Sequence, residues 1–308
     1  MIQILDEIVT DQNLAWNNEL QNKIENFYVE LSDDAINEIL ENKMNLDENS
    51  KNLVILQNEI KEFKKILVRG CGFFIIKHSC FSNFSEDEKK SIFSIISKIL
   101  GTLYVQNIKN EKYVVITDEG KSMKTGGRYH QTKEGGSFHT DSPQWTKTPD
   151  YIALFCLHPA KIGGTSKFLS AYSIHNQMFK ENRILLEQLY HKFHFDKRNE
   201  FKENESPTVF EPIFKYENKN LTLRYLRNYI DEGHQIQKQF LTKLQIESLD
   251  LFDKISNDDS ICVNYDLKAG DMVFSNNNRI LHGRTSFEDH EDPNLKRYLI
   301  RVWIKDNN

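Results

Sequence analysis

The chain has 308 residues, a net charge of −5 and a sequence pI ≈ 6.1, and 28% of its residues are charged. This length suffices for one large core, and the mild acidity without a dense basic run argues against a nucleic-acid surface. Residues 1–9 have neither a basic start nor a long apolar segment, and the four cysteines lack a paired zinc spacing. We therefore expect one domain, residues 1–308, in a reducing compartment such as the cytoplasm, with no membrane partner.

The first third of the chain is predicted to be mainly helical. Apolar residues recur at helical spacing over residues 33–39, which follow an acidic cap, and again over residues 53–66. Ser85 and Glu88 form the pattern of a capping box, so a helix should run from Ser85 to about Leu100. Strands are expected at residues 70–77, 104–108 and 113–117.

Strands alternate with two long helices beyond residue 150. Residues 151–158 are almost continuously apolar, which is typical of a buried strand. Helices are expected at residues 171–190 and 237–255, and a polar loop at residues 197–206. Further strands are expected at residues 166–169, 191–195, 209–216, 221–226, 261–265 and 271–275.

The last predicted strand has two different faces. Alternation over residues 297–304 places Arg297, Leu299, Arg301 and Trp303 on one face and only apolar side chains on the other. If the apolar face packs on a core, the two arginines point into a barrel lumen or to solvent. A lumenal guanidinium needs an anionic partner, and a dicarboxylate co-substrate would be one.

A possible metal site begins at His139-Thr140-Asp141, at the end of a short predicted strand after Gly135-Gly136. Residues two apart on a strand point to the same side, so His139 and Asp141 form a chelating pair. His282, far downstream, supplies a second imidazole. Two imidazoles and one carboxylate can occupy one face of an octahedral metal, as in non-haem Fe(II) oxygenases. A single His-x-Asp pattern is more often a surface or hydrogen-bonded core histidine.

Closure between such distant segments suits an all-β double-sheet barrel. The expected fold is therefore mainly β with helical additions (α+β). Its core is a double-stranded β-helix, or jelly roll, over about residues 67–308 with helical inserts. A helical N-terminal scaffold occupies about residues 1–66.

The motifs resemble the Fe(II)/2-oxoglutarate-dependent dioxygenases of the taurine dioxygenase and clavaminate synthase-like group. The matching segments are residues 138–141, 149–156, 163–166, 277–287 and 297–301, and they occur in the order of that family over about residues 135–304. The last two segments resemble the clavaminate synthase branch, which often carries Glu where this chain has Asp141.

The resemblance implies that His139, Asp141 and His282 bind Fe(II), and that Arg297 grips the distal carboxylate of 2-oxoglutarate in a bidentate fork. The hydroxyl of Ser166, or of its neighbour Thr165, would bind the same carboxylate, although a plain turn also explains this segment. The family chemistry consumes O2, releases succinate and CO2, and hydroxylates an unactivated C–H bond. Asp141 is a carboxylate and frees no position for halide, which disfavours halogenation; desaturation stays open.

Four residues are predicted at the substrate site, namely Gln106, Arg128, Arg224 and Arg301. Their cations favour an amino acid or a related small carboxylate metabolite, either free or tethered to a carrier. Arg224 and its neighbour Arg227 could bind an anionic group or could instead form salt bridges with Asp231 or Glu232. Arg301 could support Arg297 rather than contact substrate.

Two other functions stay open. The first is a non-catalytic barrel that binds a metal or a small acid. The second is zinc hydrolysis, which would not require Arg297.

Overall fold

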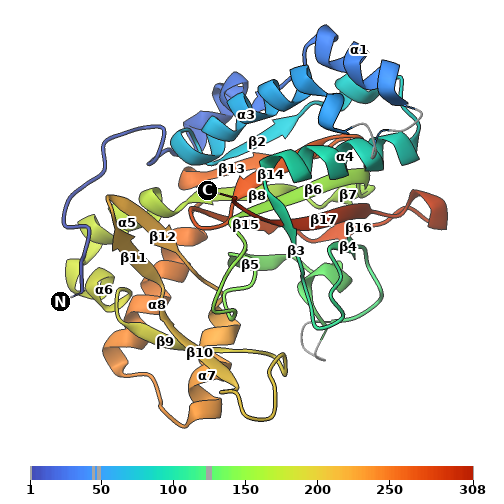
Figure 1. The fold of residues 1–308 in the computed structure, drawn as a ribbon. Helices are drawn as coiled ribbons and strands as arrows, with labels where there is room; N and C mark the ends of the chain where they lie inside the picture. Colours follow the sequence, from blue (N-terminus) through green and yellow to red (C-terminus); the bar gives the residue numbers. More distant parts are fainter. Residues whose placement is uncertain (1, 44–45, 47–49, 123–126, 308) are drawn as a thin grey trace.

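The structure is a computed structural model that describes residues 2–43, 46, 50–122 and 127–307. Its centre is a pair of facing β-sheets (Figure 1). The larger sheet contains β1 (Tyr28–Val29), β2 (Phe73–Ile76), β3 (Thr102–Tyr104), β4 (Tyr113–Ile116), β6 (Tyr151–His158), β14 (Met272–Asn276) and β17 (Tyr298–Lys305). The smaller sheet contains β5 (Gly136–His139), β8 (Ser166–Ser170), β13 (Cys262–Tyr265) and β15 (Ile280–Arg284).

The strand order is β1-β2-β14-β6-β17-β3 in the larger sheet, with β4 also beside β17, and β13-β8-β15-β5 in the smaller. Three two-stranded sheets lie outside them. Their strands are β7 (Ile162–Gly163) with β16 (Phe287–Glu288), β9 (Lys192–Asp196) with β10 (Thr208–Pro212), and β11 (Phe214–Glu217) with β12 (Asn220–Leu223). The helices are α1 (Asp33–Asn42), α3 (Val54–Arg69), α4 (Glu86–Leu100), α5 (Ala171–Glu181), α6 (Arg183–Gln188), α7 (Arg227–Gln237) and α8 (Lys243–Ser256). This architecture confirms the predicted double-sheet core with helical additions.

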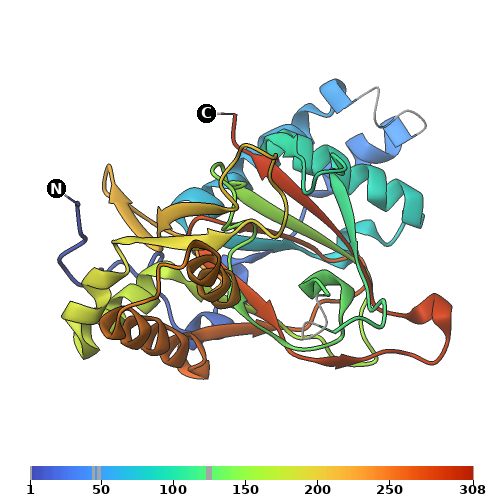
Figure 2. The same cartoon turned by 90° about the horizontal axis from the view of Figure 1, so that it is seen from below.

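Three apolar clusters hold the layers together. Between the sheets, Phe73 of β2 stacks on Phe168 of β8 with ring centroids 4.5 Å apart. α1, α3 and α4 cover the outer face of the larger sheet, where Val302 and Ile304 of β17 are buried. α5, α6 and α8 pack with β9–β12 against the smaller sheet. Figure 2 shows these two helical groups on opposite sides of the strands.

The alternation predicted for β17 is confirmed by these clusters. Val302 and Ile304 face the N-terminal helices, whereas Leu299 belongs to the cluster between the sheets. The capping box predicted at Ser85 is also present at the start of α4. No helix in the described ranges combines the length and the apolarity needed to cross a membrane.

Several predicted boundaries were wrong for local reasons. The single helix expected over residues 171–190 is two helices, because Asn182 leaves helical geometry and its side chain caps α6 at the Leu185 amide. The strand expected over residues 209–216 breaks at Ile213, whose N–H donates to the Leu189 carbonyl instead of a strand partner.

Other elements were misplaced or absent from the prediction. α7 was not predicted, and the strand expected at residues 104–108 lies at Thr102–Tyr104. Before the N-terminal helices, β1 pairs in parallel with β2 and extends the larger sheet. His282 lies on its own strand, β15, in the opposite sheet from the strand predicted before it.

The turn before β15 is tied to α3 by a buried arginine. Arg279 donates from Nη1 to the Val68 carbonyl (2.7 Å) and from Nη2 to the Gly70 carbonyl (3.0 Å). Its guanidinium also lies 5.6 Å from the centre of the Tyr172 ring. The carbonyls at the end of a helix lack intrahelical partners and carry partial negative charge, so a cation there satisfies them. Arg279 therefore joins the N-terminal helices to the strand that carries His282.

We predict that Arg279→Leu lowers the free energy of unfolding by about 2–3 kcal/mol, since the charged hydrogen bonds of a buried arginine are lost and the carbonyls at the end of α3 stay unpaired. Arg183→Leu is the matched control. The Arg183 side chain is 51% exposed and forms surface ion pairs with Asp6 and Glu187, so its removal should cost below about 1 kcal/mol. Urea denaturation of both variants measures the difference, and equal losses would contradict the role of Arg279.

Candidate metal and co-substrate site

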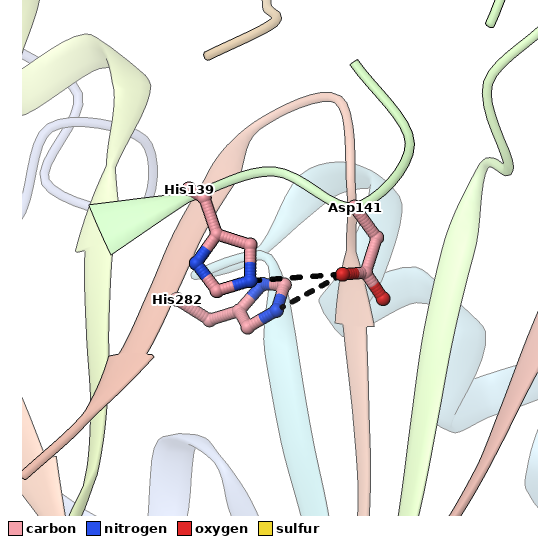
Figure 3. Close-up of side chains that lie close together, drawn as sticks. All are labelled: His139, Asp141 and His282. Carbon is pink, nitrogen blue, oxygen red and sulfur yellow. Dashed lines mark ion pairs between the residues drawn. The ribbon is translucent and has the colours of Figure 1, made fainter. Parts of the chain in front are cut away.

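Three side chains meet where the smaller sheet opens beside β17. His282 on β15 stands directly opposite His139 at the end of β5, and Asp141 follows two residues later. The Nε2 atoms of His139 and His282 lie 3.7 Å and 3.6 Å from the same oxygen, Asp141 Oδ1 (Figure 3). One donor atom from each residue lies within 4.8 Å of the others. The structure thus brings together the three predicted ligands.

The backbone of Asp141 is fixed from the neighbouring turn. Asn277 Oδ1 accepts from the Asp141 amide (2.7 Å), and Asn277 Nδ2 donates to the Asp141 carbonyl (3.0 Å). The next residue, Ser142, has φ 55°, a left-handed conformation that is strained for a non-glycine residue. These contacts turn the chain out of β5 so that the carboxylate faces the two imidazoles.

Burial keeps His139 in the form that a metal needs. Burial, with His282 beside it, lowers the pKa of His139 to about 4, so this ring is neutral at pH 7. His139 Nδ1 lies 3.0 Å from the Ser137 carbonyl, an acceptor that fixes the proton on Nδ1. The lone pair of His139 is therefore on Nε2, the atom that faces Asp141. Tyr129 packs edge-on against the same ring at 5.1 Å.

The Asp141 carboxylate is buried but well compensated. Trp303 Nε1 donates to Asp141 Oδ2 (2.7 Å), and Arg301 Nη1 lies 3.1 Å from the same oxygen. Burial alone would raise the pKa of Asp141, but Arg301 and the two histidines outweigh it and hold the pKa well below its usual range. The carboxylate is therefore ionised at neutral pH. Two imidazoles and one carboxylate suit a divalent first-row metal such as Fe(II).

Arg297 provides a separate anion site. It is 5% exposed at the start of β17, and its Nη1 has no hydrogen-bond partner among the described residues. Arg284 is also buried nearby, and both guanidiniums lie over the Phe287 ring, at 4.7 Å and 5.1 Å from its centre. Burial and Arg284 lower the pKa of Arg297 to about 10, which leaves it protonated at neutral pH. A buried cation with an unused donor fits the carboxylate of a keto diacid.

The two predicted hydroxyls differ in their positions. Thr165 borders the same cavity as Arg297, but its hydroxyl donates to Asp266 (2.6 Å). Ser166 is buried at the start of β8, where it pairs with Arg284 across the sheet. Gly164 lies so close to Arg297 that a Cβ there would be 3.3 Å from its Nε. This turn therefore packs directly on the guanidinium.

A cavity of about 130 Å³ is lined by His139 and Asp141 of the triad. Three of the four predicted substrate residues line it, namely Gln106, Arg128 and Arg301. Arg224 does not: its Nη1 donates to the carbonyls of Pro143 and Trp145, so it supports the segment after Asp141. The anticipated salt bridge to Asp231 is formed by Arg227, at 3.1 Å. For Arg224 no bridge to Asp231 or Glu232 is found among the described contacts.

The cavity residues have partners that were not anticipated. Gln106 Oε1 accepts from Arg301 Nε (2.8 Å), and its Nε2 donates to the carbonyls of Arg301 and Lys112, so the Gln106 amide is occupied. Arg128 pairs with Glu200 at 2.6 Å, from the loop between β9 and β10. His130 also lines the cavity.

The sequence did not identify Trp303 or Asn277 as site residues. Trp303 was placed on the lumenal face by strand alternation, and that face is the signal that could have included it. Asn277 lies within a matching motif, but its contact with Asp141 depends on a turn whose shape the sequence did not show.

Comparisons with known proteins agree with this geometry. The family described as "Taurine catabolism dioxygenase TauD, TfdA family" matches residues 45–303. FR-33289 synthase of Streptomyces rubellomurinus is 32% identical over 249 residues, which cover 79% of this chain and 71% of that protein. The taurine hydroxylase-like protein SAT17 of Stachybotrys chartarum is 26% identical over 169 residues, 54% of this chain and 41% of that protein.

Solved structures share the fold at low sequence identity. An asparagine oxygenase in complex with Fe(II), a 3-hydroxyasparagine and succinate superposes with a TM-score of 0.71 at 14% identity, covering 91% of this chain and 93% of that one. The oxygenase OrfP in complex with Fe and alpha-ketoglutaric acid gives a TM-score of 0.65 at 14% identity, covering 90% and 94%. The family match over most of the sequence decides the class: the chain belongs to the TauD/TfdA dioxygenases and is an Fe(II)- and 2-oxoglutarate-dependent oxygenase.

Proposed function

We propose that the protein hydroxylates an unactivated C–H bond of an amino acid or a related small carboxylate metabolite, with release of succinate and CO2. His139, Asp141 and His282 would hold Fe(II). The single observation that carries this proposal is the convergence of both imidazole Nε2 atoms on one Asp141 oxygen.

Different side chains would bind the metal and the co-substrate. When bound, Fe(II) supplies the site at which O2 and 2-oxoglutarate react, since three protein ligands leave the opposite face open. Arg297 would bind the distal carboxylate of 2-oxoglutarate, with Ser166 or Thr165 as the neighbouring hydroxyl. Among the described residues Arg297 Nη1 has no other partner, which supports this role.

The cavity favours a small polar substrate. Its volume of about 130 Å³ is below the roughly 300–1,000 Å³ typical of sites for drug-sized ligands. Arg301 uses Nε and Nη1 for Gln106 and Asp141. Its Nη2 makes no hydrogen bond with the residues that the structure describes, so we assign it to an anionic group of the substrate. The solved relatives whose complexes contain hydroxyasparagine and hydroxy-L-Arg favour an amino acid. The amino acid could be free or tethered to a carrier, and the screen described below distinguishes these two forms.

We also infer one dioxygenase domain over residues 1–308 and a cytoplasmic location. The N-terminal helices share a buried cluster with β2, β14 and β17, which supports a single folding unit. All four cysteines are free, and three of them are buried, which is typical of a reducing compartment.

Asp141→Ala should abolish retention of Fe(II), because the one carboxylate ligand is lost and only the two imidazoles remain. Glu111→Ala removes a carboxylate that lines the same cavity but lies outside the triad, and it should keep the metal. Metal content after anaerobic loading and desalting gives the measurement. Equal iron in the two variants would exclude Asp141 as a ligand.

Arg297→Leu should raise the KM for 2-oxoglutarate at least about 30-fold, since a charge-assisted contact of about 2 kcal/mol is lost, while Fe(II) is still retained. Lys161→Leu is the control, because Lys161 borders the same cavity but is exposed. Succinate release at varied 2-oxoglutarate measures both. A KM shift of similar size in both variants would remove the special role of Arg297.

A screen of free amino acids and other small acids should identify the substrate by succinate release coupled to a mass gain of one oxygen atom. Loss of two hydrogens would instead indicate desaturation. Activity only on a carrier-bound amino acid would select the tethered form, and activity only on uncharged or polymeric compounds would overturn the substrate proposal. A protein that binds metal but never consumes 2-oxoglutarate would be a non-catalytic barrel.

A further inference from the structure

We propose that Trp303 and Arg301 are positioning residues that hold Asp141 as a one-oxygen metal ligand. This inference rests on the proposed function, because it assumes that the triad binds the metal. It concerns how the carboxylate is oriented and gives Arg301 a role that does not need substrate.

The contacts on the two carboxylate oxygens are unequal. Asp141 Oδ2 accepts from Trp303 Nε1 at 2.7 Å and lies 3.1 Å from Arg301 Nη1. Asp141 Oδ1 is the oxygen that both histidine Nε2 atoms approach. Arg301 Nη1 is nearer to Oδ2, but its N–H donates to Oδ1, at 3.3 Å. A carboxylate oxygen has about two lone-pair directions, so Oδ1 can accept from Arg301 and still face the metal position. Trp303 occupies Oδ2, and the Arg301 cation holds the carboxylate through both oxygens.

Both donors reach the carboxylate from one strand. Arg301 and Trp303 are two residues apart on β17, and side chains at that spacing project from the same face. The two side chains also touch: the Arg301 guanidinium lies 5.0 Å from the centre of the Trp303 ring. A single strand therefore supplies a hydrogen-bond donor and a cation in fixed relative positions.

Each donor is held in turn by its own neighbours. Trp303 is buried, and β17 pairs it with Ile152 of β6 and Tyr104 of β3. Gln106 Oε1 accepts from Arg301 Nε, while Gln106 Nε2 donates to the Arg301 carbonyl. Gln106 thus fixes the guanidinium, because it binds both the side chain and the backbone carbonyl of Arg301. Outer contacts of this kind orient metal ligands and commonly change metal affinity 10- to 100-fold when removed, as order-of-magnitude values.

Trp303→Phe tests the proposal, because it keeps the aromatic ring and removes the N–H. Trp145→Phe is the matched control. Trp145 packs edge-on against Trp303 at 5.5 Å, but its Nε1 donates to Glu200 (3.1 Å) and not to Asp141. The probe is Co(II) alone, titrated into the full-length apoprotein without 2-oxoglutarate or substrate. Its visible absorption reports the number and type of ligands.

We expect Trp303→Phe to raise the Kd for Co(II) about tenfold, because the carboxylate is no longer held in one orientation. The shape of the Co(II) absorption bands should also change, because Oδ2 becomes free to join the ligand set. Trp145→Phe should leave the Kd within about twofold of wild type, with unchanged bands. Wild-type affinity and bands in Trp303→Phe would overturn the proposal. The same loss in both tryptophan variants would also overturn it, because the effect would then be one of general packing.

Arg301→Leu provides a second reading that does not depend on the fold of Trp303→Phe. It should also change the Co(II) absorption bands without substrate, because the carboxylate loses the cation that holds both of its oxygens, whereas an arginine that only binds substrate would leave the bands unaffected. Wild-type bands in Arg301→Leu would remove Arg301 from the proposal. The two levels of inference separate in the wild-type titration. If wild type fails to bind Co(II), the proposed metal site itself is wrong, whereas binding in wild type with no change in the variants refutes only the positioning role.

Discussion

The site depends on the antiparallel pairing of β15 with β5, which puts His282 opposite His139. Facing residues of an antiparallel pair project on the same side of a sheet, so this register alone brings two imidazoles together from segments 143 positions apart. A slip of one residue would turn one ring to the other face. Contacts at both ends of β15 protect the register: Arg279 anchors the preceding turn to α3, and Tyr129 accepts from the Arg284 amide (3.0 Å).

A second constraint is the surplus of positive charge inside the barrel. Arg284 and Arg297 are buried, and Arg301 pairs with the Asp141 carboxylate. Arg284 donates to the Thr132 carbonyl and lies over the rings of Tyr129 and Phe287, and among the described residues no carboxylate forms a salt bridge with it. Burying cations without full compensation costs free energy, and a bound dianion would remove that cost. The unused donor of Arg297 therefore fits a co-substrate that completes the charge balance.

The sequence predicted what depends on local periodicity or on spacing. Strand alternation placed Arg301 and Trp303 on one face of β17, and the His-x-Asp spacing predicted that His139 and Asp141 would project together. It did not predict which groups Gln106 and Arg224 would bind, because those partners lie on segments brought close only by the tertiary fold. The break between α5 and α6 was missed for a related reason. Asn182 interrupts an otherwise helical apolar pattern by capping, a local competition that periodicity does not register.

The engaged cations also bear on selectivity. Arg128 already pairs with Glu200, and Arg301 with Asp141, so a substrate anion has to share these guanidiniums instead of meeting free ones. Sharing lowers the net gain from charge alone, because each guanidinium is already partly neutralised. Shape and neutral polar contacts then carry more of the discrimination between substrates. Arg301 also links the cavity to the proposed metal site, because it lines the cavity and contacts Asp141. A substrate group that draws Arg301 towards the cavity therefore weakens its contact with the Asp141 carboxylate.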